Sequence, residues 1–319
     1  MKVLVTGSAG FLGYYIARDL AKDADNMIVC VDNFVRGEND DLYQDLIAKP
    51  NVEQVVGDLN DQAFVSSLPD DVDIIFHMAA LNGTQNFYER PFEVVRCCTL
   101  PTMFLLQKYG PLGRLKRWIY AGTSEAYAST VTRFGWEIPT AEDVPLGIDD
   151  IFNNRWSYGA SKMHGEIATV NACQHFNVPF SIVRFHNAYG PRMGDKHVVP
   201  DFLMRTKNDV FELYGYEDTR SFIYADDASR ATIGVAMSEA CANQLVNIGS
   251  EDEITIHDLG KKMMIAAGKE GEIVLHPSPK GSVKRRAPNI AKLKELTGYE
   301  AEWTLSAGLK ATAEFYLAD

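Results

Sequence analysis

The sequence predicts an α/β protein in which a doubly wound parallel sheet is accompanied by a smaller C-terminal α/β lobe. Two observations predict this class. In the first half of the chain, short apolar runs alternate with amphipathic helical patterns, as in parallel sheets with helices on both faces. From about residue 186 the pattern changes to loops rich in proline and glycine with shorter elements. With 319 residues, the chain can bury a large core in one domain or two lobes.

The apolar runs of the first half predict strands at 2–6, 27–32, 52–56, 73–77, 116–121 and 179–185. Each run is nearly continuous in apolar residues, as expected when helices cover both faces of a strand. Helical periodicity predicts helices at 11–22, 61–67, 91–109 and 157–176. The second half predicts strands at 211–214, 221–224 and 244–248, and helices at 197–208, 225–237, 255–268 and 304–316.

The composition argues against several classes of function. A net charge of −12 opposes binding to nucleic acid. No apolar run is long enough to cross a bilayer, and the N-terminus leads directly into a strand without a signal-peptide pattern. The five cysteines are scattered without a Cys-x-x-Cys pair, which predicts reduced, buried thiols in a cytoplasmic protein. Neither they nor the seven histidines show metal-ligand spacing, so we expect no metal and no membrane contact.

Basic residues nevertheless recur between Arg184 and Arg286. Those singled out between these two are Arg192, Lys196, Arg205, Lys207, Arg220, Lys284 and Arg285. An acidic protein that gathers cations in one half is expected to bind a small anion there. For any single one of these residues, a solvated surface charge is the better explanation.

A glycine-rich turn follows the first predicted strand. Gly7 permits a tight turn, Gly10 lets the backbone approach a pyrophosphate, and Gly13 allows the helix to pack closely on the strand. The phosphates would lie at the helix N-terminus, beside Phe11 and Leu12. The spacing Gly-x-x-Gly-x-x-Gly differs from the commoner fingerprint and could by itself be a chance turn. Its position between strand and helix favours a Rossmann-type dinucleotide site.

The ends of the next strands predict the rest of that site. Asp32 ends the second strand, where an acid accepts from the ribose 2′-hydroxyl and repels a 2′-phosphate, so NAD is favoured over NADP even though Arg36 is close. Asp58 and Leu59 follow the third strand; Asp58 either contacts adenine or caps the helix near Asp61. The path to the nicotinamide would be lined by three residues after the fourth strand, Met78, Ala79 and Ala80.

Tyr158 and Lys162 are one helical turn apart and therefore project from the same helix face. A tyrosine is a poor base at its free pKa near ten, but a neighbouring ammonium and a pyridinium favour the phenolate. Without the glycine turn, a surface i,i+4 pair would be the better interpretation. Together with that turn, the pair predicts a proton-transfer site.

Thr123, Ser124 and Glu125 follow the fifth strand at its carboxyl end, where open α/β sheets bind ligands. A hydroxyl there can bridge Tyr158 and a substrate hydroxyl, and the adjacent carboxylate can act on a neighbouring carbon. The alternative for Glu125 is a solvated loop residue.

Taken together, these motifs resemble the extended short-chain dehydrogenase/reductase superfamily, in its nucleotide-sugar epimerase, dehydratase and decarboxylase branch, over essentially the whole chain. The matching segments are Gly7-x-x-Gly10-x-x-Gly13, Asp32-Asn33-Phe34, Gly57-Asp58-Leu59, His77-Met78-Ala79-Ala80, Thr123-Ser124-Glu125-Ala126-Tyr127, Tyr158-x-x-x-Lys162, Arg184 to Arg192, Arg220 to Asp227, and Arg286 to Ile290.

The resemblance implies transient oxidation of a sugar, usually at C4. Tyr158 would remove a hydroxyl proton that Thr123 or Ser124 shares, while NAD takes the hydride and later returns it. Asn33 would join the cofactor residues. The substrate, a UDP- or GDP-linked sugar, would be held by Asn187, His197, Val198, Arg205, Arg220 and Arg286.

The resemblance leaves the net reaction open. Glu125 is typical of enzymes that act beyond C4, and Thr123-Ser124-Glu125, Asn154 to Tyr158 and Arg286-x-Pro-x-Ile are most similar to UDP-glucuronate decarboxylases. A C4 or C3/C5 epimerase and a 4,6-dehydratase remain alternatives. Cys97-Cys98 stands where asparagine is common, and 83–86 departs from the usual substrate loop, so the sugar is undetermined. A catalytically silent NAD-binding regulator is the alternative class, and such proteins usually lose the tyrosine or the lysine.

The resemblance also implies a division of the chain. We expect residues 1–185 to form the NAD-binding domain, with 225–250 packed against it, and 186–319 to form an interleaved nucleotide-sugar lobe. Helices 91–109 and 157–176 would pair with their copies in a homodimer.

Overall fold

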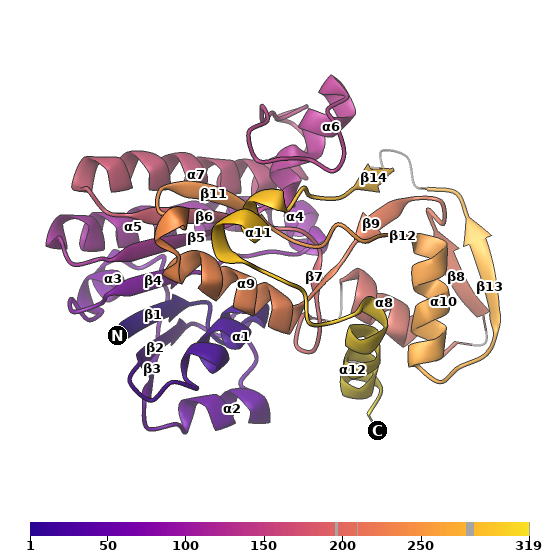
Figure 1. Cartoon of the computed structure of the whole chain (residues 1–319), viewed down its shortest axis with the longest axis horizontal. Helices are drawn as coiled ribbons and strands as arrows, with labels where there is room; N and C mark the ends of the chain where they lie inside the picture. The colour runs from indigo at the N-terminus through magenta and orange to yellow at the C-terminus, as the bar shows by residue number, and fades with distance from the viewer. Residues whose placement is uncertain (195–196, 209, 279–283, 319) are drawn as a thin grey trace.

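The computed structural model describes residues 1–194, 197–208, 210–278 and 284–318. Its centre is a seven-stranded parallel sheet with the order β11-β6-β5-β4-β1-β2-β3 (Figure 1). The strands are β1 (Lys2–Thr6), β2 (Met27–Asp32), β3 (Val52–Val56), β4 (Ile74–His77), β5 (Arg117–Thr123), β6 (Phe180–Phe185) and β11 (Gln244–Ile248). The predicted doubly wound sheet is therefore confirmed. Its strand order reverses between β1 and β4, which opens a crevice at the carboxyl edge.

Helices cover both faces of this sheet and enclose two apolar cores. One face carries α1 (Phe11–Leu20), α2 (Asp41–Ile47), α9 (Ala225–Met237) and α11 (Ala291–Thr297). The other carries α3 (Gln62–Ser67), α5 (Pro91–Tyr109) and α7 (Trp156–Phe176). Trp118 and Tyr120 of β5 are fully buried in the second core. These cores hold the strand ends, and hence the candidate site, in fixed positions.

The expectation that every strand is covered on both faces is wrong for β3. This strand lies at the sheet edge, and Glu53, Gln54 and Val56 are exposed. An edge strand has neither a second strand neighbour nor full helix cover, so it tolerates polar side chains. The central strand β5 shows the expected pattern, because all seven of its residues are buried.

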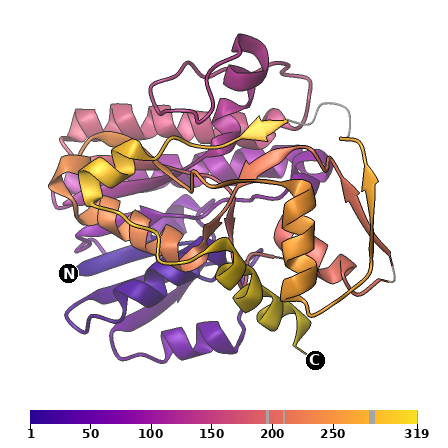
Figure 2. The same cartoon turned by 45° about the vertical axis from the view of Figure 1, so that its right-hand side comes forward.

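The C-terminal lobe is shown in Figure 2. It encloses a third apolar core. Its elements are β7 (Ala188–Tyr189), α8 (Val198–Arg205), β8 (Val210–Tyr214), β9 (Thr219–Ser221), β10 (Ile223–Tyr224), β12 (Glu253–Thr255), α10 (Ile256–Ala266), β13 (Glu272–His276), β14 (Arg285–Arg286) and α12 (Leu305–Leu317). The single strand predicted at 221–224 is wrong, because β9 and β10 belong to different sheets. Phe222 between them leaves the strand ladder and packs edge-on against Tyr189.

Four short helices were not predicted from the sequence: α2, α4 (Thr84–Glu89), α6 (Ala128–Phe134) and α11. Each has six or seven residues, which is shorter than the window over which helical periodicity becomes visible. The short α6 protrudes from the body of the molecule (Figure 1). The loop that returns from α6 to α7 carries the exposed side chains of Ile151 and Phe152.

All five cysteines are unpaired. Four are buried as expected, whereas Cys97 is partly exposed. Within the part of the chain that the structure describes, no helix is long and apolar enough to cross a membrane.

Candidate active site

A cavity of about 690 Å³ lies at the carboxyl edge of the main sheet. It collects residues that are far apart in the sequence because parallel strands end at the same edge. The predicted residues among its lining are Gly7, Gly10, Phe11, Leu12, Gly13, Asp32, Asn33, Asp58, Leu59, Met78, Ala79, Ala80, Thr123, Ser124, Glu125, Tyr158, Lys162, Asn187, His197 and Arg286. Val198, Arg205 and Arg220 lie outside this lining.

The glycine turn forms a cradle that side chains would fill. Gly7 has a φ of +68°, and a Cβ there would come within 2.9 Å of the Ala79 backbone. A Cβ on Gly13 would lie 2.0 Å from the Gly7 carbonyl oxygen. Gly10 is the N-cap of α1 and has no side chain to cap the first helical N–H groups. The free N–H groups of a ten-residue helix thus face the cavity, and a dinucleotide pyrophosphate fits there.

Asp32 and Asp58 fix the loops around this cradle. The Asp32 carboxylate accepts hydrogen bonds from the Ala9 N–H at 2.9 Å and the Phe34 N–H at 2.8 Å. The Asp58 carboxylate accepts from Asn60, both from its N–H at 3.0 Å and from its side-chain amide at 2.8 Å. The cap of α3 is Asp61, so the interpretation of Asp58 as that cap is wrong. Both carboxylates line the cavity where the ribose and adenine contacts were predicted.

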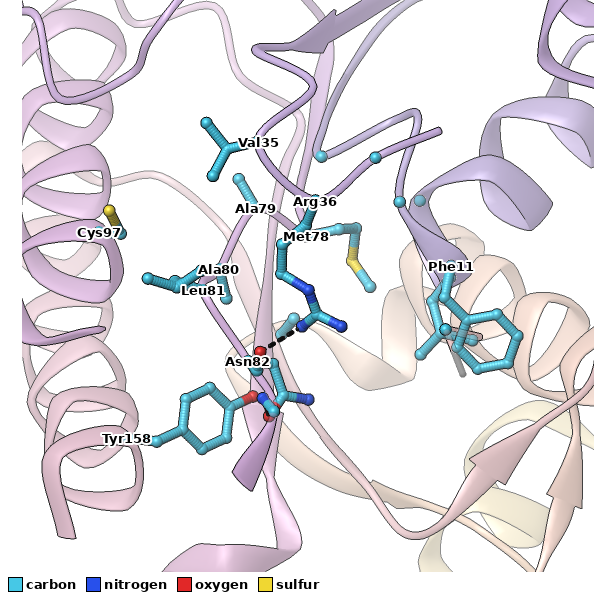
Figure 3. Close-up of a pocket in the computed structure, with 18 of the residues that line it drawn as sticks. Phe11, Val35, Arg36, Met78, Ala79, Ala80, Leu81, Asn82, Cys97 and Tyr158 are labelled. Carbon is cyan, nitrogen blue, oxygen red and sulfur yellow. Dashed lines mark hydrogen bonds between the residues drawn. The ribbon is translucent and has the colours of Figure 1, made fainter. Parts of the chain in front are cut away.

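Arg36 crosses the cavity in a way that the sequence did not predict. Its Nη1 donates a 2.6 Å hydrogen bond to the Asn82 carbonyl oxygen, which links the loop after β2 to the loop after β4 (Figure 3). Burial lowers the pKa of the guanidinium. In the sequence, this contact is indicated only by the position of Arg36, four residues after Asp32. By itself that position does not distinguish Arg36 from a surface charge.

The buried hydroxyl of Thr6 fixes the backbone of the segment that follows β4. The Thr6 Oγ1 accepts hydrogen bonds from the N–H groups of Met78 and Ala79, each at 3.1 Å. Thr6 also lies 2.9 Å from Nδ1 of His77. Burial lowers the pKa of His77 to about 3, so this ring is neutral at physiological pH. It holds the strand end without adding charge to the cavity.

Tyr158 and Lys162 both lie in the interior on α7, where they are 7% and 2% exposed. The Tyr158 ring stacks on Phe87 with a centroid distance of 5.0 Å. The Lys162 Nζ lies 4.9 Å from the centre of the Tyr120 ring. Phe87 was not predicted, since it belongs to the short helix α4.

The side chains around Tyr158 do not by themselves lower the pKa of its phenol. Burial raises the pKa of this phenol; Cys98 and Glu125 raise it further, and Arg36 and Thr123 offset only part of that rise. Burial also lowers the pKa of Lys162. The phenol is therefore neutral here, and a phenolate requires additional positive charge in the cavity.

Thr123 to Glu125 form the turn at the end of β5. The Thr123 Oγ1 accepts from the Glu125 N–H at 3.2 Å. The Glu125 carboxylate is 2.7 Å from Nη1 of Arg286 and 3.3 Å from Nη2 of Arg155. Burial raises its pKa, but the two guanidinium groups outweigh burial and lower the pKa to about 2. Glu125 is thus an ionised, paired carboxylate, and its interpretation as a solvated loop residue is wrong.

Arg220 and Arg205, both predicted to bind the substrate, lie outside the lining of the cavity and have other partners. Arg220 donates to the Thr219 carbonyl oxygen at 2.7 Å. Burial, with the nearby charge of Arg286, lowers the Arg220 pKa to about 10. Arg205 forms a surface ion pair with Asp201 on α8 at 2.6 Å.

Other members of the basic series serve the fold. Arg184 forms a buried ion pair with Glu166 at 2.6 Å, and Arg192 contacts Asp40 at 2.5 Å. Lys196 lies outside the described residues. Of the predicted series, Arg192 and Arg286 line the cavity, and the Arg192 guanidinium there is already paired with Asp40.

The chain is similar to known proteins over most of its length. The family model described as the NAD dependent epimerase/dehydratase family matches residues 3–249. UDP-N-acetyl-alpha-D-glucosaminuronate decarboxylase of Bacillus cytotoxicus is 29% identical, over 99% of this chain and 97% of that protein. UDP-glucuronic acid decarboxylase 4 of Arabidopsis thaliana is 28% identical, over 97% of this chain and 67% of that protein.

Among solved structures, UDP-glucuronic acid 4-epimerase from Bacillus cereus, in complex with UDP-glucuronic acid and NAD, superposes with a TM-score of 0.87. It is 25% identical, and the match covers 99% of both chains. The similarity to these proteins therefore extends over both the sheet and the C-terminal lobe.

Proposed function

Because the chain belongs to the NAD dependent epimerase/dehydratase family, we propose that it is an NAD-dependent enzyme that oxidises a nucleotide-linked sugar transiently at C4 and then acts at the neighbouring carbons. Its favoured substrate is a UDP-hexuronate, and the favoured net reaction is decarboxylation. The observation that carries this choice is the ionised Glu125 between Arg286 and Arg155 at the cavity wall. Two guanidinium groups around one carboxylate leave a net positive charge, which suits an anionic sugar.

The cradle at Gly7, Gly10 and Gly13 supports binding of the dinucleotide, with Asp32 and Lys162 at its two ribose ends. When bound, NAD⁺ would accept a hydride from the sugar and later return it, so that no cofactor is consumed. The residues of this chain supply the proton chemistry and the positioning.

Tyr158 is the proposed acid–base residue. Its phenol is buried at the cavity wall, and Thr123 next to it lowers its pKa slightly. Positive charge brought into the cavity next to this phenol would lower its pKa and make it lose its proton more easily. Tyr158 would then take the proton of the sugar C4 hydroxyl, and Thr123 or Ser124 would share it.

Glu125, Arg286 and Arg155 are proposed to act at C5 and C6 of the sugar. Since its pKa is about 2, Glu125 is ionised at neutral pH and cannot serve as a general acid. Arg286, which lines the cavity, has guanidinium donors besides the one on Glu125 that can hold a sugar carboxylate at C6. A ketone at C4 would then allow that carboxylate to leave as carbon dioxide. The Glu125 carboxylate is also placed to take a proton from C5, so epimerisation and 4,6-dehydration remain the alternative reactions.

The experiment is a product assay by mass spectrometry and NMR. Purified protein is incubated with UDP-glucuronate, UDP-N-acetylglucosaminuronate, UDP-glucose and GDP-mannose. Loss of carbon dioxide from a hexuronate supports the proposal. Loss of water, or an unchanged mass with altered ring couplings, would select dehydration or epimerisation instead. Binding of NAD without conversion of any sugar would favour the silent regulator.

We also propose that the protein is a homodimer in the cytoplasm. On α5 and α7 the apolar side chains of Phe92 (74% exposed) and Ile167 (63%) are exposed, as are those of Val95 and Leu100 on α5. A second copy of the two helices would cover these side chains in a four-helix bundle. The unpaired cysteines are in keeping with a reducing compartment.

A further inference from the structure

Asn247 on β11 is fully buried behind the candidate site and does not line the cavity. Its side-chain nitrogen donates to the carbonyl oxygens of Thr140 and Asn289, each at 3.1 Å. Its side-chain oxygen accepts from the Tyr127 hydroxyl at 2.9 Å and lies 3.2 Å from Nε2 of His186. These four contacts use both donor hydrogens and both lone pairs of the amide.

Three of these four contacts reach a segment that carries a residue of the candidate site. Tyr127 ends the turn that contains Glu125, and Asn289 is three residues after Arg286. His186 precedes Asn187, which lines the cavity. One buried side chain therefore touches the three segments that place Glu125, Arg286 and Asn187.

Thr140 strengthens the connection to the Arg286 segment. Its N–H donates to the Ala287 carbonyl oxygen, and its own carbonyl oxygen accepts from the Asn289 N–H, both at 2.9 Å. The Asn247 amide therefore anchors a pair of segments that are already bonded to each other. The backbone N–H of Asn247 adds a 2.9 Å hydrogen bond to the Glu142 carboxylate, in the loop that leads to Arg155.

We propose that Asn247 is a positioning residue for the sugar end of the site: its amide sets the Glu125 turn and the Arg286 segment in the relation that forms their ion pair. The need for such a residue follows from the fold. Arg286 belongs to a two-residue strand, β14, and Glu125 belongs to a short turn. Neither element forms enough backbone hydrogen bonds of its own to fix the position of its side chain. Neutral His186 also suits this role, because burial lowers its pKa to about 3 and leaves its ring uncharged beside the amide.

The test measures the Glu125 carboxyl directly. Protein labelled with ¹³C at glutamate carboxyls is titrated by NMR, and the Glu125 signal is assigned as the one missing from Glu125→Gln. The charges that act on Glu125 are those of Arg286 and Arg155, which lower its pKa, and Arg220 also interacts with it. Asn247→Leu removes all four contacts without adding charge. If Asn247 positions the pair, this variant moves the Glu125 midpoint upward, because Arg286 no longer sits at 2.7 Å.

Two matched controls separate positioning from loss of stability. Val246→Ala also perturbs the buried core of β11, but Val246 packs with the α1–α9 core. Tyr127→Phe removes the buried phenol contact to Asn247, together with the contact of the same phenol to Arg184. Tyr109→Phe on α5 removes a similar phenol contact, to the Pro69 carbonyl oxygen. We expect Asn247→Leu and Tyr127→Phe to shift the Glu125 midpoint, and Val246→Ala and Tyr109→Phe to leave it unchanged. Equal midpoints in all four variants, or equal shifts, would overturn the proposal.

Turnover provides a second readout that rests on the proposed function. Bound NAD, measured by its release on denaturation, should stay at the wild-type level in Tyr127→Phe, since the cradle is untouched. The rate of product formation should fall, by up to about 100-fold in Asn247→Leu, because misplacement of a reacting group has costs of that order. If the wild-type protein converts no sugar, the proposed function fails, while the Glu125 titration still decides the role of Asn247. If Asn247→Leu does not fold, Tyr127→Phe with its control decides it.

Discussion

Glu125 and Arg286 lie 161 residues apart in the sequence and 2.7 Å apart at the wall of the cavity. Arg155 contacts the same carboxylate from a third segment at 3.3 Å. The glycine cradle, in contrast, is built from one short turn between β1 and α1. The dinucleotide end of the site is thus local in the sequence, and the sugar end is assembled from distant parts of the chain.

Replacement of Tyr158 by phenylalanine should abolish turnover and leave NAD bound. The ring and its stacking on Phe87 are retained, while the proton-transferring hydroxyl is lost. General acid–base residues contribute about 100- to 10,000-fold, so kcat should fall by at least about 100-fold. NAD content after denaturation and product formation are the two measurements. A fully active variant would refute the assigned role.

Replacement of Glu125 by glutamine should impair chemistry at C5 or C6 far more than C4 epimerisation. The amide keeps the shape of the side chain but removes the charge that Arg286 and Arg155 share. Each activity is followed in the same variant, with ring couplings in NMR for C4 and mass change for C6. If both fall equally, Glu125 is needed for positioning alone; if neither changes, it is no base.

The same substitution should alter the dependence of stability on pH. The Glu125 pKa is about 2 in the folded protein, compared with an ordinary value of 4.5. A depressed pKa contributes stability above the ordinary value, and this contribution is lost as the pH falls from 4.5 towards 2. The difference in free energy of unfolding between wild type and Glu125→Gln should therefore shrink over that interval. A constant difference would contradict the ion pairing.

Replacement of Glu166 by glutamine should destabilise the fold strongly. Glu166 pairs with Arg184 through two contacts of 2.6 and 2.9 Å, and both side chains are less than 9% exposed. Removing one partner of a buried pair leaves an uncompensated charge and costs about 3–5 kcal/mol. Asp201→Asn, at the surface pair with Arg205, is the control and should cost at most about 1 kcal/mol. Denaturant titration compares the two.

Replacement of Ile167 by glutamate should convert the proposed dimer into monomers. Ile167 is 63% exposed on α7, so the change costs the isolated chain little, whereas a charge in a helix–helix interface is strongly unfavourable. Light scattering after gel filtration measures the mass. Ile265→Glu is the control, because Ile265 is 78% exposed on α10, outside the proposed interface. A dimer that survives Ile167→Glu would place the interface elsewhere.

The sequence by itself determined the central sheet and the dinucleotide end of the cavity. Strands buried between helices have continuous apolar runs, and β1, β2 and β11 lie at the predicted residues. Gly7 and Gly13 could be recognised because a tight turn and a close backbone approach exclude any side chain. Tyr158 and Lys162 could be paired because helix geometry alone puts positions i and i+4 on one face.

Only the tertiary structure decided which charges are available at the site. Arg184, Arg192 and Arg286 have the same side chain, yet the first two are held by Glu166 and Asp40 and the third meets Glu125 at the cavity. It likewise decided that burial raises the pKa of Tyr158. Ion pairing and desolvation depend on contacts between segments that are distant in the chain, and no local pattern of residues encodes those contacts.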